Sequence, residues 1–112
     1  MGVQIRLEFE PCRSLAFGNL SGTYAALGGP LAHSARMLIL QNSTNTAVWI
    51  SKNGVDDHLP LMPNGYMILD LTSNKTIPVG FFLSQGDQLY VKQRGAVPNT
   101  GFIDLSVIYG AE

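Results

Sequence analysis

The sequence contains a single cysteine, Cys12, and few charged residues. One cysteine excludes an internal disulfide framework and leaves a free thiol or a bridge to another molecule, and we expect the free thiol. Charged residues make up only 13% of the chain, about half of the usual share. The surface must therefore carry many neutral or apolar groups, which favours a subunit of an assembly over a free monomer.

The net charge is close to zero, and no apolar run is long. A formal net charge of -1 gives no basic field for nucleic-acid phosphates and no polybasic segment for lipid headgroups. No run approaches the roughly 18 apolar residues of a membrane-spanning helix. The segment from Met1 to Arg6 lacks the basic-then-apolar order of a signal peptide. We therefore predict no nucleic acid and no membrane as partners, and folding in the cytoplasm.

Residues that could support catalysis or bind a metal are few and scattered. The chain has two histidines and eight acidic residues, and no nucleophile signature accompanies them. The most suggestive polar cluster is Asp56-Asp57-His58, but its spacing is not that of a defined metal loop. Capping of the loop backbone, with an aspartate as the acceptor, explains the cluster better. We predict no enzymatic activity, no metal and no cofactor.

Apolar and polar residues alternate in several short segments. Every second residue of 3–9 is apolar, which is typical of a half-buried strand, and Pro11 ends it. The same period of two returns in residues 88–93 and 101–109. The first strand could extend into the sheet of a neighbouring subunit as an arm formed by residues 1–11, but we favour pairing within its own chain.

The sharpest turn signal is Asn64-Gly65. It lies between the apolar segments 59–63 and 66–71, and it predicts a two-residue type I′ hairpin. Pro60 cannot donate to a strand ladder, so the first of these segments should lie at the edge of a sheet.

Further turn signals divide the rest of the chain. The Asn-rich residues 42–45 predict a second hairpin between strands at 36–41 and 46–51, and a turn at 85–87 follows a strand at 79–83. We count roughly seven to ten short strands and no helical period, as in sandwiches and small barrels. The sequence therefore predicts one all-β domain over residues 1–112, a single-domain antiparallel β-sandwich, with a jelly roll preferred to an immunoglobulin-like fold.

Because the sequence contains no catalytic set, we expect the chain to act by binding other molecules, either through surface side chains or through a strand that pairs with a neighbouring sheet. Trp49, Tyr66 and Tyr90 could form a stacking surface for sugars, although rings at strand spacing more often pack on a sheet. The residues that we predict to contact a partner come from the first strand, the only tryptophan and the acidic loop: Val3, Ile5, Leu7, Phe9, Trp49, Asp57 and His58.

A series of short motifs runs from Leu40 to Gly110. In order, they are Gly-Val-Asp-Asp-His at 54–58, Pro-Asn-Gly at 63–65, Leu-Asp-Leu-Thr-Ser-Asn-Lys at 69–75, Gly-Phe-Phe at 80–82, Gly-Asp-Gln-Leu-Tyr-Val-Lys at 86–92, and Gly-Phe-Ile to Ile-Tyr-Gly at 101–110. Together these motifs resemble a family of small phage virion proteins, similar to the capsid cement or decoration proteins of short-tailed phages.

The resemblance implies a jelly roll that stabilises a capsid by binding between subunits of the major capsid protein, or other virion subunits. The chain would then be located in the virion and be assembled in the host cytoplasm. We expect a homo-oligomer, a dimer in preference to a trimer. The alternative is a phage tail, fibre or receptor-binding module that recognises cell-surface glycan through a surface that includes Trp49.

Overall fold

A computed structural model of the protein describes residues 6–70 and 85–111. The described residues form β-strands and one short 3-10 helix, η1. In chain order they are β1 (Arg6–Phe9), β2 (Arg13–Ala16), η1 (Phe17–Asn19), β3 (Ala25–Ala26), β4 (Ala35–Asn42), β5 (Val48–Ser51), β6 (Leu59–Leu61), β7 (Tyr66–Asp70), β8 (Tyr90–Gln93) and β9 (Phe102–Ala111).

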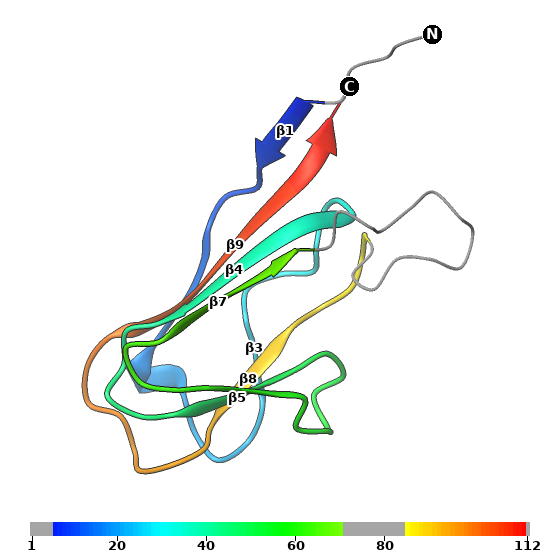
Figure 1. The fold of residues 1–112 in the computed structure, drawn as a ribbon. Helices are drawn as coiled ribbons and strands as arrows, with labels where there is room; N and C mark the ends of the chain where they lie inside the picture. Colours follow the sequence, from blue (N-terminus) through cyan, green and yellow to red (C-terminus); the bar gives the residue numbers. More distant parts are fainter. Residues whose placement is uncertain (1–5, 71–84, 112) are drawn as a thin grey trace, which may run out of the picture.

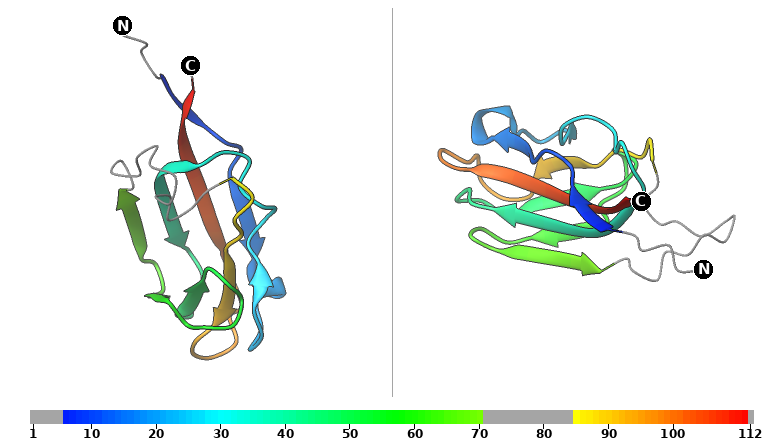
Figure 2. Two further views of the ribbon diagram at one scale, coloured as in Figure 1. Left: turned by 90° about the vertical axis from the view of Figure 1, so that its right-hand side faces the viewer. Right: turned by 90° about the horizontal axis from the view of Figure 1, so that it is seen from above.

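The strands build two antiparallel sheets that pack face to face (Figures 1 and 2). The β9 sheet has the order β1-β9-β4-β7, and β2 also pairs with β9. The β8 sheet has the order β3-β8-β5-β6. This arrangement confirms the predicted all-β antiparallel sandwich, and β6, which contains Pro60, lies at a sheet edge as expected.

The core lies between the sheets and is made by the inward-facing residues of both. Leu38, Val48 and Val107 are among the side chains that are completely buried. The predicted alternation of the last two strands is confirmed, because Val91 on β8 and Leu105 on β9 are buried. Alternation with a period of two places one side of each strand in the core and leaves the other side facing outward.

β1 and β2 form one interrupted edge strand along β9. Phe9 pairs with Ile108 and Arg13 with Leu105, so one extra residue lies between them, as in a β-bulge. The extra residue changes which face the odd-numbered residues occupy. As a result, Leu7 and Phe9 are 63% and 67% exposed, and the prediction of a half-buried first strand is wrong for these two side chains. β1 and the end of β9 project beyond the other strands (Figure 1).

Neither predicted hairpin exists, because the chain changes sheet at both turns. β4 and β7 belong to the β9 sheet, whereas β5 and β6 belong to the β8 sheet. The turn before β7 places Pro63 and Asn64 at its centre, with the Gly65 N–H donating to the Met62 carbonyl at 3.0 Å. Asn64, the third residue of this turn, has a φ of 59°. A proline followed by a residue with positive φ is typical of a type II turn rather than type I′. The strand expected at 79–83 lies outside the described residues.

Candidate protein-binding surface

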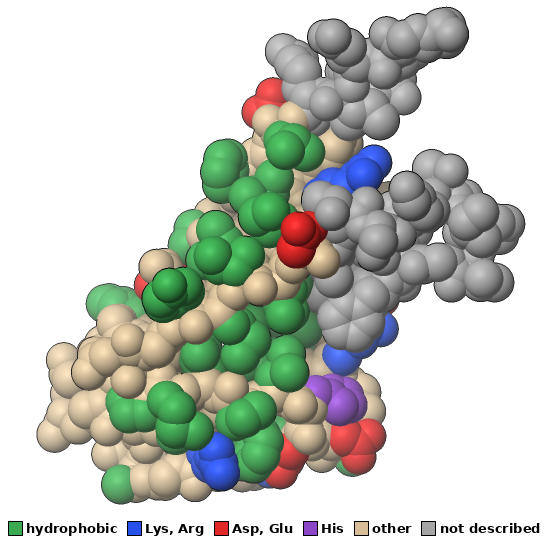
Figure 3. Space-filling model, in the orientation of Figure 1, with side chains coloured by type: hydrophobic (Ala, Val, Ile, Leu, Met, Phe, Trp, Pro, Cys, Tyr) green, Lys and Arg blue, Asp and Glu red, His purple; other side chains and the backbone are tan. Residues whose placement is uncertain are grey.

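The side of the β9 sheet that faces away from the core carries a contiguous group of apolar side chains. Phe9, Ile108 and Met37 are register neighbours across β1, β9 and β4, and Ile39 and Ile68 are neighbours across β4 and β7. With Leu7 they form what we call the outer apolar face: Leu7, Phe9, Met37, Ile39, Ile68 and Ile108. Hydrophobic side chains gather over these strands in Figure 3.

The outer apolar face is large for a surface in contact with water. Leu7 and Phe9 are mostly exposed, Ile68 is 53% exposed, and the other three side chains are half-buried. The six together expose roughly 500 Å² of apolar surface, if a large side chain has about 200 Å². The largest patches on monomeric proteins reach about 300–600 Å² and are often binding sites. This face is therefore a candidate surface for contact with another protein.

The sequence indicated part of this face and missed the rest. Leu7 and Phe9 were predicted to contact a partner and lie on it, whereas Val3 and Ile5 lie outside the described residues. The sequence did not predict the other four, Met37, Ile39, Ile68 and Ile108. β4 and β7 are apolar on both sides and were interpreted as hairpin partners, and the alternation of 101–109 places Ile108 on the polar side of its strand. In a two-layer sandwich one side of every strand faces outward, so a strand that is apolar on both sides must place apolar side chains on the outer surface. This pattern in β4 and β7 could have indicated the outer apolar face.

Trp49 and Asp57 lie on the opposite side of the molecule, over the β8 sheet, whereas His58 lines the cavity between the two sheets. Trp49 is half-buried, and the guanidinium of Arg94 lies 4.7 Å from the centre of its ring. Tyr90 is on the adjacent strand β8, but Tyr66 belongs to the β9 sheet. The structure therefore does not bring Trp49, Tyr66 and Tyr90 together as one stacking surface.

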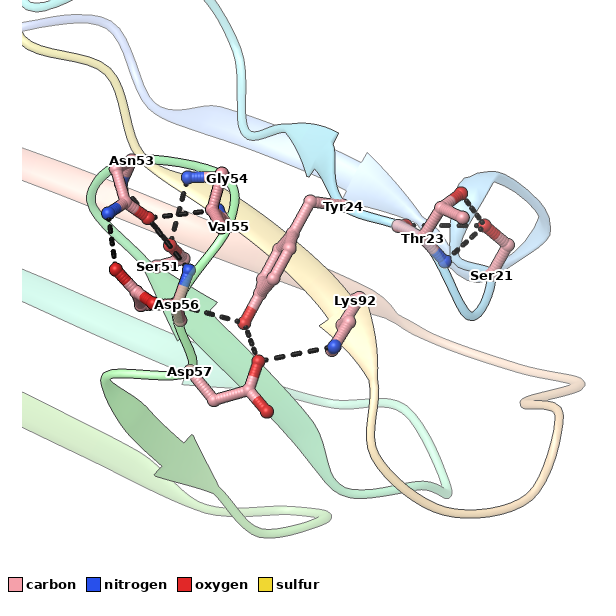
Figure 4. Close-up of polar contacts among 10 residues, drawn as sticks. All are labelled: Ser21, Thr23, Tyr24, Ser51, Asn53, Gly54, Val55, Asp56, Asp57 and Lys92. Carbon is pink, nitrogen blue, oxygen red and sulfur yellow. Dashed lines mark hydrogen bonds and ion pairs between the residues drawn. The ribbon is translucent and has the colours of Figure 1, made fainter.

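The acidic loop after β5 is held by side chains that cap its backbone (Figure 4). Ser51 Oγ accepts the N–H of Gly54 at 2.9 Å, and Asn53 Oδ1 accepts the N–H of Asp56 at 2.9 Å. His58 Nδ1 accepts the N–H of Lys52 at 3.1 Å. The loop backbone is capped as expected, but the prediction that an aspartate is the acceptor is wrong: Ser51, Asn53 and His58 accept these bonds.

Asp57 fixes this loop against the β8 sheet. Its carboxylate accepts the hydroxyl of Tyr24 at 2.5 Å and lies 3.2 Å from the Lys92 ammonium (Figure 4). The bond from Tyr24, together with Lys92, lowers the pKa of Asp57, although partial burial opposes the shift. Burial, followed by the bond to Asp57, raises the pKa of the Tyr24 phenol far above its ordinary value. All three groups are thereby engaged within the chain.

The described residues provide little for metal or membrane binding. Across residues 6–70 and 85–111, no three His, Cys, Asp or Glu side chains are close enough to hold a metal ion. No helix among those residues is long and apolar enough to span a membrane. Cys12 is exposed and unbridged within the chain.

Comparison with known proteins assigns the chain to no family. No protein-family model matches it, and no curated protein does. A chain from the solved structure titled "Bacillus endospore appendages form a novel family of disulfide-linked pili" aligns with a TM-score of 0.47 and 9% identity, over 98% of this chain and 93% of that one. Function therefore has to be inferred from the surfaces of the molecule.

Proposed function

We propose that the protein is a non-enzymatic structural subunit that binds other protein subunits through the outer apolar face. The observation that carries this proposal is the exposure of Leu7, Phe9 and Ile68 at 63%, 67% and 53% on one side of one sheet. Proteins rarely leave a contiguous apolar face of this size uncovered unless it is a binding site, because exposed apolar surface promotes association. A partner that packs on the β9 sheet would cover it.

The expected strength of one such contact is modest. Burying roughly 500 Å² of apolar surface contributes about 12 kcal/mol at about 25 cal/mol per Å². Lost translational and rotational freedom costs an estimated 4–15 kcal/mol. A single copy would bind weakly, but many copies on a regular lattice bind strongly through avidity. This energy balance suits a protein that stabilises a large symmetric assembly.

We propose a virion as that assembly, with the chain acting as a capsid cement or decoration protein between subunits of the major capsid protein. The support for this step is the resemblance of the motifs between Leu40 and Gly110 to small phage virion proteins. The low charge of the chain, 13%, is compatible with a subunit whose surface is largely covered.

Particles that carry variants of the chain test the proposal. Phe9→Lys with Ile68→Lys places two charges on the outer apolar face. Val97→Lys is the matched control, because Val97 is 74% exposed and lies outside that face. We expect the double variant to be absent from purified particles, which should lose resistance to heat and osmotic shock. Retention of the double variant, or stripped particles with unchanged resistance, would refute the proposed function.

We also propose that the sandwich is a jelly roll. Strands β2, β9, β4 and β7 make one four-stranded layer, and β3, β8, β5 and β6 make the other. From β2 onward, every connection except the one from β5 to β6 passes from one layer to the other. Two four-stranded sheets linked in this way are expected of two interleaved Greek keys.

A further inference from the structure

Two cavities in the described structure differ in chemistry. One, of about 330 Å³, lies between the sheets and is lined mainly by leucine and isoleucine. The other, of about 280 Å³, lies at the surface, where β4 ends and β7 and β9 begin, beside the turn before β7. We call it the Tyr66 cleft, and it is lined by Gln41, Asn42, Ser43, Asn64, Gly65, Tyr66 and Asp104. Most of the described residues that line the second cavity are polar and could orient a ligand.

The strand register places three of these side chains in one row. Gln41 on β4 pairs with Tyr66 on β7 and with Asp104 on β9. All three therefore face outward on the same side of the β9 sheet, at the end opposite β1. Alternation puts them on that side because their sequence neighbours, Leu40 and Leu105, are buried in the core.

A buried amide holds the wall of the Tyr66 cleft in place. Asn42 is 2% exposed, and its Nδ2 donates to the carbonyls of Thr46, Leu61 and Met62 at 2.8, 3.2 and 3.2 Å. The Asn42 backbone N–H donates to the Gly65 carbonyl at 2.8 Å. These bonds connect β4 to the turn before β7, so the cleft is preformed rather than assembled by a ligand.

The groups that face the cleft retain unused hydrogen-bonding capacity. Tyr66 is 68% exposed. Within the described part of the chain, the Tyr66 hydroxyl and the Gln41 and Asn64 side-chain amides make no hydrogen bond. Asp104 accepts one bond, from the Ser14 hydroxyl at 2.5 Å through Oδ1, which leaves Oδ2 available. The cleft thus offers a carboxylate acceptor, two amides that both donate and accept, and an open aromatic ring.

We propose that the Tyr66 cleft binds one residue of a neutral saccharide. A sugar ring presents an apolar C–H face, which packs on an aromatic ring, and neighbouring hydroxyls, which donate to a carboxylate and pair with amides. Asp104 accepts two such hydroxyls, and Gln41 and Asn64 bind the flanking ones. Among the described residues no lysine or arginine lines the cleft, and the Asp104 carboxylate repels anions, so the site disfavours phosphate, sulfate and acidic sugars.

The size of the cleft indicates a weak site that is used in many copies. Its volume of about 280 Å³ lies just below the roughly 300–1,000 Å³ of pockets for drug-sized ligands. One sugar residue fills it, and Ser43 and the Asn64-Gly65 turn limit extension on one side. Repetition of the site in an assembly would convert weak binding into firm attachment to a glycan-coated surface. The Tyr66 cleft lies on the same side of the β9 sheet as the outer apolar face, beyond Ile39 and Ile68 at the end opposite β1. Sugar binding by the isolated chain does not depend on a protein partner of that face.

Titration of the purified full chain with single sugars tests the proposal. The probes are glucose, galactose, mannose and N-acetylglucosamine, with sialic acid and glucose 6-phosphate as acidic comparisons. Binding is followed by amide chemical shifts in two-dimensional NMR, which also report the location of the site. We expect at least one neutral sugar to bind in the millimolar range and to shift the amides of residues 41–43, 64–66 and 104.

Three variants separate the Tyr66 cleft from other sites. Tyr66→Ala should weaken binding at least tenfold and Asp104→Asn about fivefold, whereas Tyr66→Phe should keep most of the affinity because its ring remains. Trp49→Ala is the matched control and should bind as the wild type does. The thermal unfolding midpoint of each variant verifies that it is folded. The proposal is overturned if no neutral sugar binds, if the acidic probes bind better, or if Trp49→Ala is as damaging as Tyr66→Ala.

Discussion

The Glu10 carboxylate lies 2.7 Å from the Arg13 guanidinium, across the bulge that joins β1 to β2. The Glu10 side chain is only 2% exposed, and it also accepts a hydrogen bond from His33 Nδ1 at 2.8 Å. The His33 ring stacks on Tyr109 of β9 with 3.6 Å between ring centroids, and Arg13 donates to the Gly29 carbonyl at 3.1 Å. One buried carboxylate therefore ties the interrupted edge strand to a neighbouring loop and to β9.

Acid should weaken the fold through Glu10. Burial alone would raise the pKa of Glu10, but the hydrogen bonds from His33 and Arg13 and the Arg13 charge outweigh it, so the pKa lies below its ordinary value. A lowered pKa contributes stability that is fully present above the unfolded value of about 4.3 and is lost as the pH falls through the folded value. Urea unfolding between pH 7 and pH 3 measures this loss.

The variant Glu10→Gln isolates this contribution. It should cost about 3 kcal/mol at neutral pH, because Arg13 is left without its buried counter-charge. It should also reduce the loss of unfolding free energy between pH 7 and pH 3, which is the acid limb of the stability profile. Glu8→Gln, on the more exposed part of the same strand, should change stability by less than about 0.5 kcal/mol. If both variants kept the wild-type acid limb, Glu10 would not be its source.

Two glycines with nearly the same backbone conformation should differ in their tolerance of alanine. Gly101 and Gly86 have φ values of 92° and 91°, which cost an L-residue about 1–2 kcal/mol. A Cβ on Gly101 would overlap the Ser43 carbonyl, whereas one on Gly86 would meet none of the described residues within 4 Å. We expect Gly101→Ala to cost about 3 kcal/mol or more and Gly86→Ala about 1 kcal/mol. If chemical denaturation showed the same loss of stability for both variants, backbone strain alone, without the overlap with Ser43, would explain the cost at Gly101.

The sequence predicts the strands of this protein better than it predicts their pairing. Alternation located β8 and β9 because each buries one side against the opposite sheet. The hairpins at residues 42–45 and 64–65 were wrong, since turn residues show where a chain reverses but not which sheet it enters next. That choice depends on long-range contacts such as those of Asn42 with Leu61 and Met62, which no local pattern contains.

The binding surfaces were predictable only in part, for a related reason. The alternation around Leu7 was visible, but the bulge before Arg13 decides that this side chain faces outward, and a bulge leaves no clear signal in the sequence. Tyr66 and Asp104 are far apart in the chain and meet through the shared neighbour Gln41. Capping of the loop after β5 is local and was predicted, but the acceptors are Asn53 and His58 and not the predicted aspartate.

The Tyr24 phenol should ionise only at unusually high pH. Burial and the Asp57 carboxylate raise its pKa far above the ordinary value of about 10. A raised pKa contributes stability that is present below the unfolded value and is lost as the pH rises through the folded one. Alkaline titration followed by ultraviolet absorbance should reveal one late phenol. Asp57→Asn should bring that step to lower pH, and Tyr24→Phe should remove it; a late step that survives Tyr24→Phe would belong to another tyrosine.

The purified chain should associate with itself through the outer apolar face. A two-fold interface needs only one self-complementary surface, and Leu7, Phe9 and Ile68 provide the exposed part of such a surface. Sedimentation velocity over a series of concentrations should show a dimer whose population falls on dilution. Phe9→Lys should shift the dissociation constant at least tenfold upward, because each copy would bury an unpaired ammonium. Val55→Lys should leave it unchanged, since Val55 is 76% exposed on the loop over the opposite sheet. A wild-type chain that is monomeric at every concentration would refute self-association while leaving a different protein as the partner of this face.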